Sequence, residues 1–345
     1  MTDYTSKFSP TEKKALELAL RYHRGQKRMG GAHYIDHPVD VANLLFQYGF
    51  RGKYVFTALC HDLLEDTDIT DQEIKDTCGR LTLEAVRLLT KKRKNEPDKE
   101  VDMDAYLAAI QQNDVAYQVK VADRTMNLWS SMDAGIPFRK RYLAETKKYY
   151  LDFAKDSPMF KELKLAYETV SHNTELEKQS YIPVDIEEIE DLNPDSDYVA
   201  VQLFSREGEM VPFTCMIQRK DIERIQKRKR KLIPKLTVTA FPDDEVRRYA
   251  SEEDFENNKD EKGPFPVASQ SILFREAESL DHHALVTGIV RGIRGEFSTM
   301  TGLKIAVFLE LLGNMITLVL DEEDFEDLKP GEVLSGILSL YGDLS

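Results

Sequence analysis

Several features are scarce in this chain, and each scarcity excludes a class of protein. Its 345 residues include only three cysteines, Cys60, Cys78 and Cys215, whose spacing forms no pairs and predicts a reducing compartment without a disulfide framework. No run approaches the roughly 20 apolar residues that a membrane span needs, and the first residues contain no apolar signal core. The sequence therefore predicts a cytoplasmic protein with no membrane contact.

An excess of positive charge is also absent, because the formal net charge is -14. Nucleic-acid binding depends on many Lys and Arg contacts to phosphates, so it is not expected here. A small anionic substrate is compatible with this charge if a local basic pocket or a metal ion receives it. The hydrophobic fraction of 41% is sufficient for a packed core, and the length suggests two domains.

Residues 1–172 are predicted to form an all-helical bundle. The run Ser9-Pro10-Thr11-Glu12 has the features of a helix start. Apolar residues then recur at helical spacing in segments such as 53–65 and 115–132, and glycines fall at or near the breaks between such segments. No strand-like alternation interrupts this series, which indicates helices joined by short loops.

The remainder of the chain changes character twice. Residues 173–197 are acidic and contain two prolines, which predicts an inter-domain linker or a solvated edge. Apolar residues alternate with a period of two from residue 198 onward, so residues 198–345 are predicted to form a β-rich domain. Within it, residues 282–345 resemble a small OB-like barrel of short strands with a helix before the last one. We find no internal repeat, and the predicted fold class is a multidomain α plus β protein.

Four residues of the helical half predict a metal site: His37, His61, Asp62 and Asp123. His61 and Asp62 are neighbours in an otherwise apolar stretch, where ionisable groups are costly unless they are paired or bind a metal. Helix bundles build metal sites from side chains on facing helices. Two imidazoles and two carboxylates suit a divalent ion of intermediate hardness, and Mn²⁺ is the first expectation.

The motifs around these residues are similar to those of RelA/SpoT-type alarmone hydrolases. The resemblance covers about residues 10–155 and consists of four motifs in order at fitting spacings. These are YHRGQKR at 22–28 with YIDHP at 34–38, ALCHDLLEDT at 58–67, TK at 90–91, and KVADRTMNL at 120–128.

The resemblance implies an HD-type helical bundle that uses one Mn²⁺ ion to remove the 3′-pyrophosphate of guanosine tetra- or pentaphosphate, which gives GDP or GTP and pyrophosphate. By motif position, the metal ligands are His37, His61, Asp62 and Asp123. Glu65 and Asp66 are expected to orient and deprotonate the attacking water, and their place one turn after the ligands supports this independently. The expected substrate contacts are Arg28, Lys120 and Asn127, with the Arg28 guanidinium packed on the nucleobase.

Two positions depart from the family pattern. Met29 stands where many relatives carry a second basic residue, and Met126 stands where they usually have histidine. These departures leave three hypotheses open: an alarmone hydrolase, an HD phosphohydrolase for another purine nucleotide such as ppApp or NADPH, and a binding protein that senses a nucleotide.

The second half of the chain shows no basic strand-loop pattern like that of the ATP-binding synthetase domain in long family members. A hydrolase without a synthetase domain is therefore expected. The run KRKRK at 227–231 is strongly basic, but the final strands carry few aromatics on which bases could stack. A protein-interaction or regulatory module is favoured over nucleic-acid binding for this half.

Overall fold

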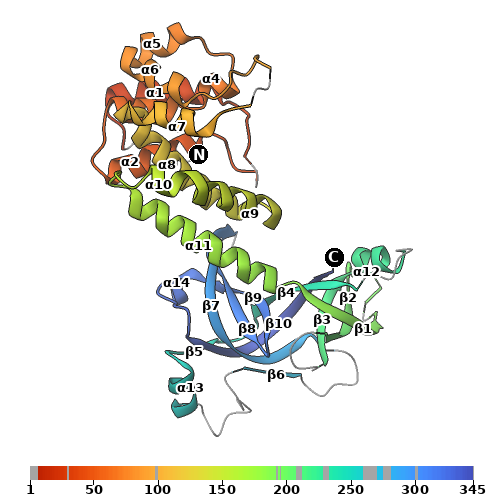
Figure 1. The fold of residues 1–345 in the computed structure, drawn as a ribbon. Helices are drawn as coiled ribbons and strands as arrows, with labels where there is room; N and C mark the ends of the chain where they lie inside the picture. Colours follow the sequence, from red (N-terminus) through yellow and green to blue (C-terminus); the bar gives the residue numbers. More distant parts are fainter. Residues whose placement is uncertain are drawn as a thin grey trace. The chain divides into compact units, whose positions relative to one another are not determined.

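The computed structural model describes residues 7–344 apart from 29–30, 98–99, 192, 195, 207–211, 228–232, 259–269, 275–280 and 300–301. The chain divides into two compact units, Met1–Ser171 and His172–Ser345. The first is helical and the second is rich in strands (Figure 1), which confirms the predicted α plus β organisation. Met29 lies outside the described residues, and so does the basic run at 227–231 except for Lys227. None of the described helices is long and apolar enough to cross a membrane.

The helical unit is built from α-helices with one short 3₁₀ helix (η1) and one π-helical turn (η2). Their bounds are α1 Pro10–Tyr22, α2 Asp36–Gln47, α3 Lys53–Cys60, α4 Leu63–Asp66, α5 Asp71–Cys78, α6 Arg80–Leu89, α7 Met103–Gln111, α8 Asp114–Ser130, η1 Ser131–Asp133, α9 Ile136–Glu145, η2 Thr146–Tyr150, α10 Leu151–Phe153 and α11 Phe160–Gln179.

The predicted helix start at Ser9 is confirmed. The Ser9 hydroxyl accepts the Glu12 backbone N–H at 3.3 Å, and the Glu12 carboxylate accepts the Ser9 N–H at 2.8 Å. This reciprocal cap satisfies two otherwise unpaired donors, an arrangement whose loss costs about 0.5–2 kcal/mol. Glu12 also accepts the Gly52 N–H at 3.1 Å, so the cap ties α1 to the start of α3.

The predicted helix over 53–65 is interrupted at the most informative point of the sequence. Helix α3 ends at Cys60 and α4 begins at Leu63, which leaves His61 and Asp62 between them. The His61 side chain donates its Nδ1–H to the Ala58 carbonyl at 2.7 Å, and a continuous helix would offer that carbonyl to the Asp62 N–H. The side-chain bond therefore accompanies a break that turns His61 and Asp62 toward one site.

The second unit contains strands that pair into one mixed sheet, with three short helices between them. The strands are β1 Ile182–Glu190, β2 Tyr198–Ser205, β3 Pro212–Gln218, β4 Lys235–Pro242, β5 Arg247–Tyr249, β6 Ser271–Phe274, β7 His283–Thr299, β8 Gly302–Leu311, β9 Asn314–Asp321 and β10 Val333–Leu344. The helices are α12 Arg219–Gln226, α13 Glu252–Asn258 and α14 Glu322–Phe325.

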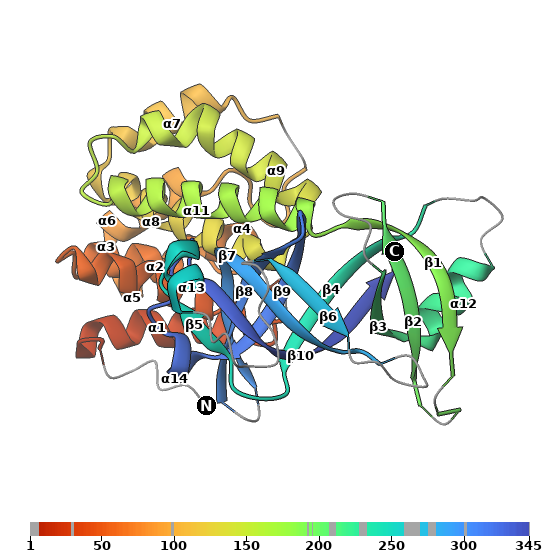
Figure 2. The same cartoon turned by 90° about the horizontal axis from the view of Figure 1, so that it is seen from below.

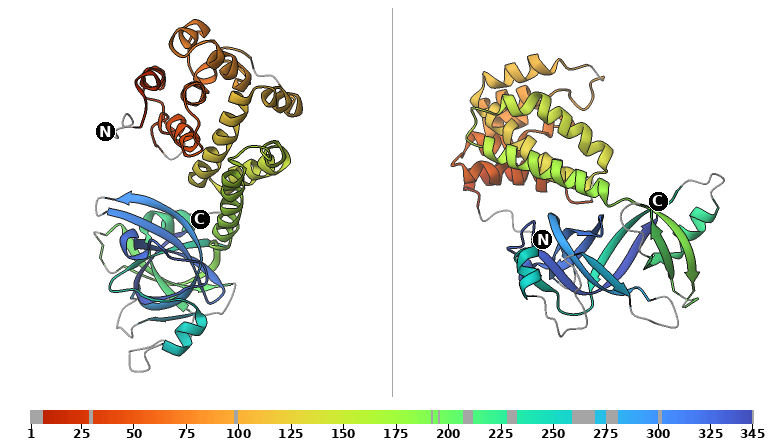
Figure 3. Two further views of the ribbon diagram at one scale, coloured as in Figure 1. Left: turned by 90° about the vertical axis from the view of Figure 1, so that its left-hand side faces the viewer. Right: turned by 60° about the horizontal axis from the view of Figure 1, so that its bottom comes forward.

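Two rings of five strands share β4 and β10. In one ring the antiparallel meander β7–β8–β9 continues into β4, which lies parallel to β9, then into β10, which pairs with β7. In the other ring the meander β1–β2–β3 continues into β10, parallel to β3, then into β4, which pairs with β1. Figure 2 shows the two meanders at opposite ends of the β unit with β4 and β10 running between them, and Figure 3 shows the strands curving around a centre.

The two rings are a structural repeat, although the sequence contains no internal repeat. Each consists of a meander, a helix (α12 or α14) and a fourth strand, and each takes its fifth strand from the other ring. The register repeats as well. The pair Ile182 and Leu236 has its counterpart in Ala284 and Leu338, with both partners shifted by 102 residues. The strand pairing repeats while the residue types differ, so the repeat is visible in the structure and not in the sequence.

Two predicted boundaries are therefore wrong. Residues 282–345 do not form a complete OB-like barrel, because their four strands close into a ring only with β4. Residues 173–197 are not a linker for most of their length, since α11 extends to Gln179 and β1 begins at Ile182. The Asn173 side chain donates to the Ile293 carbonyl at 2.7 Å, and Leu176 packs with Phe308 and Met315. This segment is part of the β unit.

Candidate metal centre and cavity

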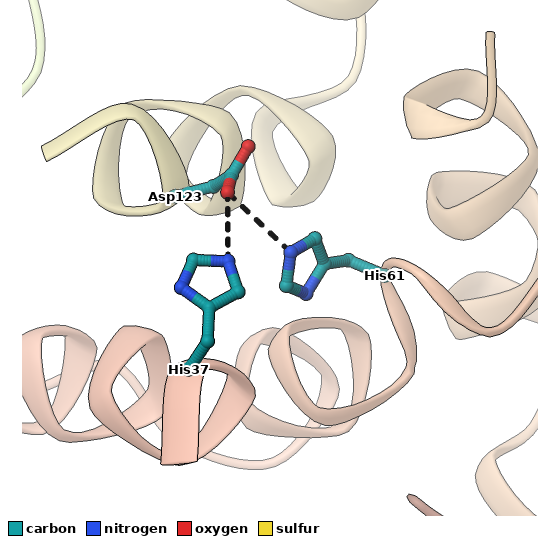
Figure 4. Close-up of side chains that lie close together, drawn as sticks. All are labelled: His37, His61 and Asp123. Atoms are coloured by element: carbon teal, nitrogen blue, oxygen red, sulfur yellow. Dashed lines mark hydrogen bonds and ion pairs between the residues drawn. The ribbon is translucent and has the colours of Figure 1, made fainter. Parts of the chain in front are cut away.

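Three buried side chains from separate parts of the helical unit meet at one point (Figure 4). His37 lies in the first turn of α2, His61 directly after α3, and Asp123 in α8. One donor atom of each lies within 4.8 Å of the donor atoms of the other two. Nε2 of His37 is 3.1 Å, and Nε2 of His61 is 3.5 Å, from Oδ1 of Asp123. The structure thus brings together three of the four predicted ligands in a cluster that could bind a metal ion.

The fit of a metal ion can be tested at His61. Because a carbonyl only accepts hydrogen bonds, the bond from Nδ1 to Ala58 places the ring hydrogen on Nδ1 and directs the Nε2 lone pair into the cluster. Nε2 is buried and has no hydrogen-bond partner among the described residues. Burial lowers the pKa of His61, but the charges of Asp62 and Asp123 outweigh it and raise the pKa. The surroundings of Nε2 therefore favour a positive charge, and a divalent cation fits.

Asp62 borders the same imidazole from the other side. Its Oδ2 lies 3.2 Å from Nε2 of His61 and accepts the Tyr34 hydroxyl at 2.8 Å. It is not within the tightest group of three donor atoms. Its role as the fourth ligand stays a prediction.

The negative charge of Asp123 is compensated by a lysine on the same helix. Lys120, one turn earlier in α8, places its ammonium 2.8 Å from Oδ2, and only 14% of the Lys120 side chain is exposed. Burial would raise the pKa of Asp123, but the Lys120 charge and the hydrogen bond from His37 hold it well below the usual range. Asn127, one turn later, donates to Oδ1 at 2.5 Å. Asp123 is therefore held ionised, as a metal ligand must be.

The predicted water-activating pair lies on α4, immediately after the ligands. Burial raises the pKa of Glu65, although the Lys91 backbone N–H, which its Oε1 accepts at 2.5 Å, opposes that rise. The Asp66 carboxylate accepts the Tyr34 hydroxyl at 2.5 Å. Tyr34 thus contacts both Asp62 and Asp66 and fixes the distance between the cluster and the pair.

A cavity of about 480 Å³ opens directly above the cluster and is lined mainly by polar side chains. All the predicted site residues except His37 line it, since His37 lies beneath them. The added lining is Lys27 and Lys91, which are cations, the aromatic residues Tyr34, Phe138 and Tyr142, and Leu89, Ser130 and Ser131. The rings of Phe138 and Tyr142 stack at 5.7 Å. A cavity that combines carboxylates with cations suits a phosphorylated ligand at a metal ion.

The predicted substrate contacts are linked to the cluster. The Arg28 guanidinium donates to the Asn127 amide oxygen at 2.7 Å, and Asn127 in turn donates to Asp123. The Arg28 guanidinium carbon also lies 5.9 Å from the Tyr34 ring centre. A ligand that binds Arg28 would therefore be coupled to Asp123 through the Asn127 side chain.

Sequence reasoning missed two residues of the cavity. Lys91 is not among the expected substrate contacts, yet it lines the cavity, is half-buried, and has a pKa lowered by burial and by the charge of Lys120. Its place after Thr90 in a family-like motif was the available signal. Tyr34 belongs to another such motif, but only the fold reveals its two carboxylate partners. Met126 packs against the helical core and is not among the residues described as lining the cavity.

Residues 15–160 match the HD domain family. The helical unit is therefore similar to HD domains over most of its length.

The relatives of this domain are of the RelA/SpoT type. The guanosine-3′,5′-bis(diphosphate) 3′-pyrophosphohydrolase of Aquifex aeolicus is 32% identical over 143 residues, and the bifunctional (p)ppGpp synthase/hydrolase SpoT of Escherichia coli is 31% identical over 147 residues. Each match covers 41% of this chain and 20% or 21% of the relative, so the chain matches about one fifth of their length. A solved metazoan orthologue of SpoT that hydrolyses ppGpp is similar over 47% of this chain and 94% of its own, at 21% identity and a TM-score of 0.41.

Proposed function

We propose that this protein is a Mn²⁺-dependent 3′-pyrophosphohydrolase that converts (p)ppGpp to GDP or GTP and pyrophosphate. The observation that carries the proposal is the His37, His61 and Asp123 cluster at the base of a cavity that also presents Glu65 and Asp66. The activity for which the Aquifex and Escherichia relatives are named supports the substrate class.

His37, His61, Asp62 and Asp123 would hold the ion. When bound, it supplies a Lewis acid that lowers the pKa of water and neutralises phosphoryl charge. Mn²⁺ suits this donor set because it accepts both imidazole and carboxylate ligands.

The chain's own residues then perform the hydrolysis. Glu65 accepts the proton of the attacking water, and its raised pKa brings its basicity closer to neutral pH. Asp66, held by Tyr34, orients the water. Lys27 and Lys91 lie where they can neutralise the phosphate oxygens of the 3′-pyrophosphate.

A screen with Mn²⁺ over ppGpp, ppApp and NADPH tests the proposal. Rapid release of pyrophosphate from ppGpp, with much slower turnover of the other two, is expected. Preferred turnover of ppApp or NADPH would replace it with an HD phosphohydrolase for another purine nucleotide. Tight binding of ppGpp without product, with Mn²⁺ present, would replace it with a nucleotide-sensing protein.

Changing Arg28 to Lys or Ala should raise KM for ppGpp by about tenfold with a smaller effect on kcat. A guanidinium that stacks on a purine contributes about 1–2 kcal/mol, and an ammonium does not replace its planar face. Steady-state kinetics measures the effect. Arg24→Ala is the matched control, since Arg24 is an exposed arginine four residues earlier. An unchanged KM in both Arg28 variants would remove Arg28 from the binding site.

The pH dependence of the reaction should report the ionisation of Glu65. Its folded-state pKa is raised, so the carboxylate form is lost as pH falls through a value above that of an ordinary glutamate. We therefore expect kcat/KM to decrease on the acid side with an apparent pKa above the usual range for Glu. A profile that stays flat down to the ordinary glutamate pKa would show that Glu65 is not the base.

We further propose that the β unit is a regulatory or protein-interaction module. The sequence argument against nucleic-acid binding supports this, because the chain carries a net charge of -14.

A further inference from the structure

A second group of metal-ligating side chains lies in the β unit, and the proposed hydrolase activity does not use it. One donor atom from each of Asp281, His282 and His283 lies within 4.8 Å of the donor atoms of the other two. Nε2 of His283 also lies 3.9 Å from Oδ2 of Asp243. Two imidazoles and two carboxylates from segments 38 residues apart thus converge at one place.

The backbone that carries these residues is fixed by β10. The Asp243 N–H donates to the Ile337 carbonyl at 3.0 Å, and the Leu340 N–H donates to the His282 carbonyl at 3.0 Å. His283 is paired with Ser339 in the ladder of β7 and β10. Both segments are therefore anchored to the same strand, so their convergence does not depend on a free loop.

Side-chain bonds orient two of the four residues. The Ser339 hydroxyl donates to Oδ1 of Asp243 at 2.5 Å, which leaves Oδ2 directed at His283. Oδ1 of Asp281 accepts Nδ1–H of His283 at 2.6 Å, which leaves the Nε2 lone pair free. A carboxylate on one ring nitrogen and a ligand position on the other is the arrangement found at histidines that bind metals.

The charges also favour a cation. Within the part of the chain that the structure describes, neither Asp243 nor Asp281 pairs with a Lys or Arg side chain, and their ionic partner is His283. The rings of His282 and His283 lie 4.1 Å apart, centre to centre. Among the described residues, two carboxylates therefore face two imidazoles without a Lys or Arg partner.

We propose that Asp243, His282 and His283 bind a transition-metal cation of the zinc class, with Asp281 orienting His283 or serving as a fourth ligand. Imidazole donors favour such an ion over Ca²⁺ or Mg²⁺, which prefer oxygen alone. Ligand atoms around tetrahedral Zn²⁺ lie roughly 3.4 Å apart, so the 3.9 Å between Nε2 of His283 and Oδ2 of Asp243 closes through a small side-chain rotation. The ion would join the end of β4 to the start of β7.

Metal counting in the full chain tests this site. The metal-free protein is loaded with Zn²⁺, excess ion is removed by gel filtration, and bound zinc per chain is measured by mass spectrometry. We expect two ions in the unmodified chain, one in His282→Ala/His283→Ala, one in Asp123→Asn, and none in the triple variant. His33→Ala is the matched control, because His33 is exposed and lies outside both clusters, and it should retain two ions.

Measurements of hydrolysis and of folding distinguish the two metal sites. His282→Ala/His283→Ala should keep its circular dichroism spectrum and its Mn²⁺-supported turnover, since the double change leaves the helical unit intact. If this variant retains as many zinc ions as the unmodified chain, or if Asp123→Asn binds none, the second site does not exist. Failure of the proposed hydrolase activity alone would leave the zinc count unchanged.

Discussion

Replacing Asp123 with Asn should abolish metal binding at the cluster and with it all measurable hydrolysis. Removing even an outer-shell partner typically costs about 10–100-fold in metal affinity, and Asp123 contacts both imidazoles directly. The substitution also leaves the Lys120 ammonium buried without its counter-charge. Breaking such a buried pair costs about 3–5 kcal/mol, so the variant should also unfold at a lower denaturant concentration.

A second change separates the loss of function from the loss of stability. In Asp123→Asn/Lys120→Met the unpaired ammonium is gone, so much of the stability should return while activity does not. Asp104→Asn is the matched control, because Asp104 is exposed on α7 and away from the cavity. Turnover and bound Mn²⁺ are measured together with urea unfolding. Substantial Mn²⁺-dependent turnover in a folded Asp123→Asn protein would remove Asp123 from the ligand set.

Glu65→Gln should bind Mn²⁺ and substrate normally and yet lose about 10²–10⁴-fold in kcat, the usual contribution of a general base. The Gln side chain keeps an oxygen that can accept the Lys91 N–H, so the local structure should persist. The amide cannot take a proton from water at neutral pH. KM, bound Mn²⁺ and kcat are measured on the same preparation.

Asp68→Asn controls for a lost carboxylate near α4, since Asp68 is exposed and pairs with Lys94 at the surface. It should behave as the unmodified chain does. A Glu65→Gln protein with a kcat within threefold of the unmodified value would assign proton transfer to another group, and Asp66→Asn would then be the next variant to examine.

The metal cluster could be predicted because its residues belong to local motifs. His61 and Asp62 are charged residues in an apolar stretch, and burial at that point required a partner. The residues around the cluster, Tyr34 and Lys91, could not be predicted in the same way. Tyr34 acquires its role only when α2 and α4 bring Asp62 and Asp66 to its hydroxyl, and Lys91 becomes a cavity residue only through the packing of its loop.

The β unit shows a different limit of sequence reasoning. The outer residues of β1, such as Glu187, Glu188 and Glu190, are exposed or partly exposed although the strand is paired. Its composition therefore resembles that of a linker. The parallel pairings of β4 with β9 and of β10 with β3 join residues about 80 to 125 positions apart, and no local pattern encodes them.

The exchange of strands between the two rings has a consequence for synthesis. The ring that begins at β1 takes its fifth strand from residues 340–344 of β10. This ring therefore cannot close until those residues have left the ribosome. Until then β3 and β4 present unpaired edges in a nascent polypeptide, a state prone to aggregation. Maturation of the β unit is therefore expected to lag behind that of the helical unit, which can form its core as it emerges.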